Sequence, residues 1–133
     1  MRAVDTNVLA RYYLHDDPAQ ARIAARILAA GDVFVPKTVM LELEWVLRPV
    51  AEQPAGKVAD CLAHLMALPG ITIEDHDEVE DALRHCRRGV DFADALPLAA
   101  SQACNELLTF DDRGHARRAA KPGLKPPVRV PPT

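Results

Sequence analysis

Apolar and polar positions follow one another along this chain in blocks that predict strands and helices in turn. Short apolar runs predict strands at 2–4, 33–36, 71–73 and 106–110, with a possible short closing strand near 128–130. Longer stretches with apolar residues three and four apart predict the helices. These helical segments are 7–14, 18–30, 38–50, 55–68, 75–89, a helix starting near 94, and 111–120. Strands that alternate with helices at this spacing indicate an α/β fold with a mostly parallel sheet.

The helix predicted over 18–30 has the clearest start and stop signals. Asp17 suits the N-cap, Pro18 the first helical position and Gln20 the capping-box position, while Gly31 ends the helix. We expect three residues to line its buried face: Ile23, Ile27 and Ala30.

The helix predicted over 38–50 has no broad polar face, so it should be largely buried, with Trp45 in the core and an end or kink near Pro49. Glu42 and Glu44 lie two positions apart, roughly 160° around the axis, and cannot serve one site together. A buried carboxylate is costly unless it is paired or bound to a metal, so one of them should have a cationic or metal partner. Periodicity leaves open which one.

Three further acids stand at the ends of elements. Asp5 and Asp111 follow predicted strands, and ligands of parallel sheets bind beyond the carboxyl ends of the strands. Asp5 either caps the next helix or projects into a cleft, and Thr6 is an alternative cap. Pro97 fits only the first turn of a helix, which places that helix's N-cap at Asp94 or later. Simple capping would explain each acid alone.

If these acids and one of the two glutamates converge, their charges need a counter-ion. Each pair about 4 Å apart repels by roughly 4 kcal/mol at an effective dielectric constant near 20. An all-carboxylate cluster without His or Cys favours Mg²⁺ or Mn²⁺ over zinc. The matching chemistry is phosphodiester hydrolysis by a metal-activated water.

Length and composition fit one domain over residues 1–133, large enough to bury a core. The three cysteines, Cys61, Cys86 and Cys104, lack any C-x-x-C pairing and predict buried side chains in a reducing compartment. Neither a leader segment nor a membrane span is apparent, so we expect a cytoplasmic protein with no membrane partner.

Charge is segregated along the chain. Residues 113–133 carry six of the 16 basic residues and none of the 19 acidic ones, so residues 1–112 carry a net charge of −9. The basic, proline-rich tail over 121–133 either steers a polyanion toward a metal-loaded site or is simply solvated. Arg11, Arg113, Arg117 and Arg118 are candidates for contacts to RNA phosphates.

Four motifs in this order resemble the PIN-domain ribonucleases of the VapC toxin type, and the resemblance covers essentially the whole chain. They are "VDTNVL" at 4–9, "VPKTVMLELEWVL" at 35–47, "DFADAL" at 91–96 and "LLTFDD" at 107–112. The resemblance implies a PIN-like three-layer sandwich, with a twisted, mostly parallel sheet flanked by helices. It also implies a homodimer that cleaves RNA with a divalent metal and is inhibited by a cognate antitoxin.

Carried over to this chain, the family pattern implies catalytic, metal-binding acids at Asp5, Glu42, Asp94 and Asp111. It thereby selects Glu42 over Glu44, and it favours Asp111 over Asp112 because the motif places an acid directly after Thr-Phe. The supporting residues that it implies or that lie beside the acids are Asn7, Thr109, Asp91 and Asp112.

Two other functions compete with a nuclease toxin. A non-catalytic PIN-like module would bind RNA or protein without cutting it, but the presence of all four acids favours the enzyme. An aspartyl-phosphate phosphatase needs a second acid two residues after the first-strand Asp, where this chain has Asn7.

Overall fold

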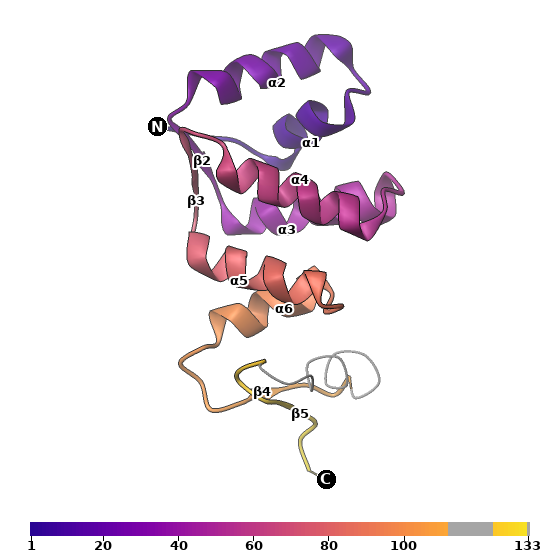
Figure 1. Ribbon diagram of the computed structural model, residues 1–133, viewed down its shortest axis with the longest axis vertical. Helices are drawn as coiled ribbons and strands as arrows, with labels where there is room; N and C mark the ends of the chain where they lie inside the picture. Colours follow the sequence, from indigo (N-terminus) through magenta and orange to yellow (C-terminus); the bar gives the residue numbers. More distant parts are fainter. Residues whose placement is uncertain (112–123, 133) are drawn as a thin grey trace. The chain divides into compact units, whose positions relative to one another are not determined.

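A computed structural model describes residues 1–111 and 124–132 of the chain (Figure 1). These residues form two compact units, Met1–His76 and Asp77–Thr133. The helix predicted over 111–120 lies almost wholly outside the described residues, as do Asp112, Arg113, Arg117 and Arg118. Among the described residues, no helix is long and apolar enough to cross a membrane.

The first unit contains a three-stranded parallel sheet in the order β1-β2-β3. In its register Arg2 pairs with Val33, and Val33 pairs with Ile71. Two helices connect β1 to β2, and α3, the π-helical turn η1 and α4 connect β2 to β3. The elements are β1 (Arg2–Ala3), α1 (Thr6–Leu14), α2 (Pro18–Ala30), β2 (Val33–Val35), α3 (Lys37–Trp45), η1 (Val46–Val50), α4 (Ala55–Ala67) and β3 (Ile71–Ile73).

Helix α1 packs against α2 and α3, and α3 packs against α4, so the helices lie beside one another in pairs (Figure 1). Side chains from the strands and from α1, α3 and α4 form the core of this unit. Its fully buried members include Leu9, Val33, Val35, Met40, Leu43, Leu62 and Leu65.

Helix α2 confirms its predicted boundaries. Asp17 is the N-cap and accepts a hydrogen bond from the Gln20 amide at 3.1 Å, Pro18 opens the helix, and Gly31 ends it. The predicted buried face was wrong, because Ile23 is 54% exposed. The helix is rotated relative to this prediction, and its buried residues are Ala21, Ala24 and Leu28.

Helix α3 also differs from its prediction in which residues it buries. Trp45 is 59% exposed, whereas Glu44 on the neighbouring position is 3% exposed. The inward stripe of the helix passes through Leu43, Glu44 and Leu47, and this places Trp45 on the outer side. Pro49 does not end the helical chain at once, since it lies inside η1.

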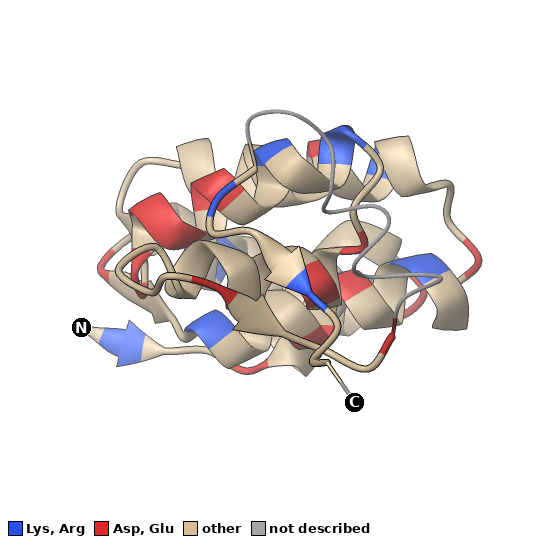
Figure 2. Cartoon of the chain, turned by 90° about the horizontal axis from the view of Figure 1, so that it is seen from below, with Lys and Arg blue, Asp and Glu red and all other residues tan. Residues whose placement is uncertain are grey.

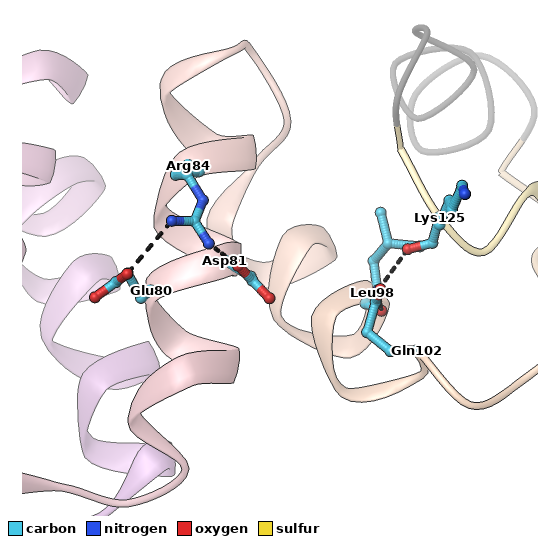
Figure 3. A network of polar contacts seen from close by, with 6 residues as sticks. All are labelled: Glu80, Asp81, Arg84, Leu98, Gln102 and Lys125. Carbon is cyan, nitrogen blue, oxygen red and sulfur yellow. Dashed lines mark hydrogen bonds and ion pairs between the residues drawn. The ribbon is translucent and has the colours of Figure 1, made fainter.

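The second unit contains α5 (His76–Arg87), which begins at the last residue of the first unit, α6 (Phe92–Ala100), β4 (Leu107–Leu108) and β5 (Val128–Arg129). β4 and β5 pair in parallel, so the closing strand that the sequence suggested is present. The Gln102 side chain donates hydrogen bonds to the carbonyls of Leu98, at 3.2 Å, and Lys125, at 2.5 Å (Figure 3). These bonds tie the end of α6 to the chain that leads into β5.

Acidic and basic residues occur on helices of both units (Figure 2). Helix α5 has acids in its first turn and bases in its last, which complements the helix dipole. On this helix Arg84 pairs with Glu80 and Asp81 (Figure 3). The cysteines do not follow their prediction, because Cys104 is exposed and the other two are half-buried.

Every strand pair that the structure describes is parallel, and the strands alternate with helices. The predicted α/β fold class is therefore confirmed. The assignment of residues 1–133 to one domain stays a prediction.

Candidate active site

Asp5 both caps a helix and lies at a strand end. The Val4 amide donates to the Phe34 carbonyl at 3.1 Å, so the pairing of β1 with β2 runs up to the residue before Asp5. The backbone of Asp5 is extended, and its Oδ1 accepts a hydrogen bond from the Val8 amide at 3.3 Å. The cap uses Oδ1 alone, and the residue is exposed. The cap is therefore Asp5 and not Thr6, which is already the first residue of α1.

Thr6 connects the first predicted acid to the second. Its side chain is 7% exposed, and its hydroxyl donates to Glu42 Oε2 at 2.9 Å. Because Thr6 directly follows Asp5, this bond brings the start of α1 and the middle of α3 into one small region of the first unit. Glu42, 37 positions after Asp5 in the sequence, is thus hydrogen-bonded to the residue that directly follows Asp5.

The two glutamates of α3 have different surroundings. Glu44 is buried and its Oε1 accepts from Arg48 Nε at 2.5 Å, one helical turn away. Glu42 is exposed and has Thr6 as its hydrogen-bond donor. The expectation that one glutamate has a cationic partner is confirmed for Glu44. Glu42 is therefore the glutamate of α3 whose side chain is exposed.

Asp94 lies in the first turn of α6, where the helix dipole favours a negative charge. The N-cap position belongs to Asp91, whose carbonyl accepts from the amides of Asp94 and Ala95 at 2.9 and 2.8 Å. The prediction that the N-cap is Asp94 or later was wrong, because Pro97 is accommodated inside the helix. Asp94 is half-buried and Asp91 is exposed.

Asp111 follows the short strand β4 and is exposed. The Thr109 amide donates to the Arg129 carbonyl at 3.0 Å, which extends the pairing with β5 beyond Leu108. The Thr109 hydroxyl in turn accepts from the Asp111 amide at 3.1 Å. Thr109 therefore restrains the backbone that carries Asp111.

Asn7 and Arg11 lie on the side of α1 that faces α2. Both line a cavity of about 330 Å³ between the two helices, together with apolar residues that include Ile23 and Ile27. The Arg11 guanidinium donates to Gln20 at 2.7 Å and to Asp16 at 2.8 Å. An RNA phosphate would have to compete with these partners for Arg11.

The donor set of the first unit suits a hard divalent cation. No group of three or more His, Cys, Asp or Glu side chains that could hold a metal occurs among residues 1–111 and 124–132. Mg²⁺, however, is commonly held by one or two carboxylates together with waters and substrate phosphates. Asp5 and Glu42 provide two such carboxylates, each with one oxygen fixed by the protein.

Thr6 is the site residue that sequence reasoning missed, since it was considered only as a helix cap. The order Asp-Thr at the strand-to-helix junction was the available signal, because it sets a hydroxyl directly after the capping acid. Its partner 36 residues later could not be read from the sequence.

The fold and the candidate site define the class of the protein. It is an α/β protein with parallel strands and with carboxylates at strand ends and helix N-termini. A family model described as the PIN domain matches residues 2–122, so the chain belongs to the PIN domain family. PIN domains are commonly nucleases, which supports a hydrolase acting on nucleic acid. Comparison with curated proteins gave no match.

Proposed function

We propose that this chain is a VapC-type toxin, an endoribonuclease that uses Mg²⁺ or Mn²⁺ to cleave RNA and is neutralised by a cognate antitoxin. Membership of the PIN domain family supports a nuclease. The single observation that carries the proposal further is the Asp5–Thr6–Glu42 arrangement. In it the residue directly after Asp5 donates a hydrogen bond to Glu42 of α3, and both acids are exposed.

In this proposal Asp5, Glu42, Asp94 and Asp111 bind the metal. The bound metal would supply a water activated for in-line attack on the phosphorus and would stabilise charge on the phosphate oxygens. Asp5 and Glu42 would each present the oxygen that the protein does not already engage. Thr109 would keep Asp111 in place through its bond to the Asp111 amide. The protein would need no side-chain nucleophile.

The toxin assignment, the homodimer and the antitoxin follow from the resemblance of the four motifs to VapC proteins. The gene next to the one for this chain tests this part of the proposal. The adjacent reading frame should encode a small protein that binds the purified chain and stops cleavage. Sedimentation of the purified chain should give the mass of two copies.

The catalytic proposal predicts that the purified full chain cleaves single-stranded RNA in the presence of Mg²⁺ or Mn²⁺. Cleavage should stop when a chelator is added. Asp5→Asn and Asp94→Asn should each lower the rate at least about a hundredfold, because each removes a metal-binding charge. Asparagine is also a good N-cap, so Asp5→Asn should keep α1 folded. Cleavage of a labelled RNA measures the rate, and circular dichroism on each variant shows whether it is folded.

Asp60→Asn is a matched control, since Asp60 is an exposed acid of α4 outside the proposed site, and it should cleave at the wild-type rate. Equal cleavage in chelator would contradict a metal-dependent mechanism. RNA binding without cleavage would instead favour the non-catalytic PIN-like module.

A further inference from the structure

The Thr6 hydroxyl is a buried polar group whose hydrogen-bond acceptor is a proposed metal-binding carboxylate. Thr6 is 7% exposed and lies at the first position of α1, and its Oγ1 donates to Glu42 Oε2 across 2.9 Å. Glu42 is exposed and belongs to another helix, α3. The bond is therefore a fixed contact from the buried side of α1 to a solvent-facing acid.

This bond constrains a side chain that would otherwise be mobile. A glutamate has three rotatable side-chain bonds, and an exposed one loses considerable rotamer freedom when it binds an ion. A hydrogen bond to Oε2 restricts these rotations in advance and leaves Oε1 to face a cation. The Val8 amide restrains Asp5 in the same manner through Oδ1. The first turn of α1 thus restrains both of the proposed metal-binding acids in this unit.

A hydroxyl in this position can act only as a donor to Glu42, because an ionised carboxylate only accepts hydrogen bonds. Hydrogen-bond partners of metal-binding groups commonly change metal affinity 10–100-fold when they are removed.

We propose that Thr6 is a positioning residue that presents the Glu42 carboxylate to the divalent metal, an inference that rests on the proposed metal-dependent function. A purely structural Thr6, which only ties α1 to α3, would change the stability of the fold and leave the metal affinity unaltered. The two roles therefore differ in a quantity that can be measured without RNA.

The test measures Mn²⁺ binding to the full chain by electron paramagnetic resonance. Thr6→Val keeps the β-branched shape and removes the hydroxyl, and it should raise the Mn²⁺ dissociation constant about 10–100-fold. Thr6→Ser retains the hydroxyl and should stay within about threefold of wild type. Thr72→Val, at an exposed position of β3, is the matched control and should leave binding unchanged.

A double-mutant cycle adds a second readout. In the background of Glu42→Gln, Thr6→Val should weaken Mn²⁺ binding by less than about twofold, because the carboxylate that it positions is gone. An equal effect in both backgrounds would overturn the positioning role. A wild-type dissociation constant in folded Thr6→Val would overturn it as well.

Thr6→Ala, a sterically less demanding variant without the hydroxyl, replaces Thr6→Val if the latter fails to fold. Unfolding of both variants would show a structural role and overturn the proposal. If the wild-type chain binds Mn²⁺ without cleaving RNA, the proposed function fails, while the comparison of dissociation constants still decides the role of Thr6. A wild-type chain that binds no Mn²⁺ would overturn both proposals.

Discussion

At the scale of single residues, burial separates two glutamates that the sequence could not tell apart. Glu44 is almost completely buried and bonded to Arg48, whereas Glu42 is exposed and bonded to a threonine. A buried ion pair contributes little net stability, but removing one partner is costly since it leaves an uncompensated charge. Glu44 is thus expected to matter for stability and Glu42 for chemistry.

Arg48→Met should therefore lower the free energy of unfolding by about 2 kcal/mol, measured by urea denaturation. This is less than the about 3–5 kcal/mol typical of fully buried pairs, because the Arg48 side chain is 35% exposed. Adding Glu44→Leu to Arg48→Met should restore most of the loss, since the buried charge is then removed. A loss below about 0.5 kcal/mol in Arg48→Met would contradict this role of the pair.

Residue types alone indicated that the acids matter and that one glutamate needs a partner. They could not place Trp45, because a helix with apolar residues all round has no unique inner face until its neighbours are known. In the structure a paired Glu44 takes an inner position and Trp45 an outer one. Thr6 was missed for a related reason, as its acceptor lies on a different helix.

At the scale of elements, the boundary of α6 shows how tertiary burial outweighs a local rule. Pro97 lies inside this helix and removes one backbone hydrogen bond, at a cost of about 3 kcal/mol. Burial of five residues of the same helix compensates for that cost, at about 1.5–3 kcal/mol for each large apolar side chain. These residues are Phe92, Ala95, Leu96, Leu98 and Ala99.

The strands β2 and β3 depend on two glycines that pack against each other where the strands begin. Gly70 has φ +76°, and a Cβ on it would lie 2.8 Å from the Gly31 Cα. Gly70→Ala should destabilise the fold by about 1–3 kcal/mol, because alanine is strained at this φ and would clash with backbone. The midpoint of urea denaturation measures this loss.

Gly56→Ala is the control for that measurement. Gly56 lies in the first turn of α4, and an added Cβ meets nothing within 4 Å. This variant should be unchanged or up to about 1 kcal/mol more stable, since alanine favours a helix. Equal losses in both variants would mean that the close approach of the two glycines is not the cause.

Helices with capping residues were predicted closely because their signals are local, as in α2. Strands were predicted at the correct places but too long, since β1, β4 and β5 each contain only two paired residues. Strand ends depend on partners distant in the sequence, which no local pattern contains. The rotation of α2 was missed for the same reason.

At the scale of the whole molecule, the proposed metal-binding acids are divided between the two units. Asp5 and Glu42 belong to Met1–His76, and Asp94 and Asp111 to Asp77–Thr133. The family model that matches residues 2–122 spans both units. The proposed function therefore assigns metal-binding acids to each unit.

Mn²⁺ at about a hundred times its dissociation constant should raise the free energy of unfolding by about 2.7 kcal/mol. Amide hydrogen exchange should slow in α1 and α3 and also in α6. Asp5→Asn should reduce the protection of α1 and Asp94→Asn that of α6, whereas Asp60→Asn should change neither. Protection confined to one unit would contradict the assignment of metal-binding acids to both.

Asp5 is both the N-cap of α1 and a proposed metal-binding acid, and this combination has an evolutionary consequence. A single nucleotide change converts its codon to one for asparagine, which caps α1 as well as aspartate does. Under the proposed function, lineages that come under pressure from this nuclease thus have a short mutational path to an inactive protein that still folds. Inactive copies with asparagine at this position should accordingly be found in genomes as intact, well-expressed genes.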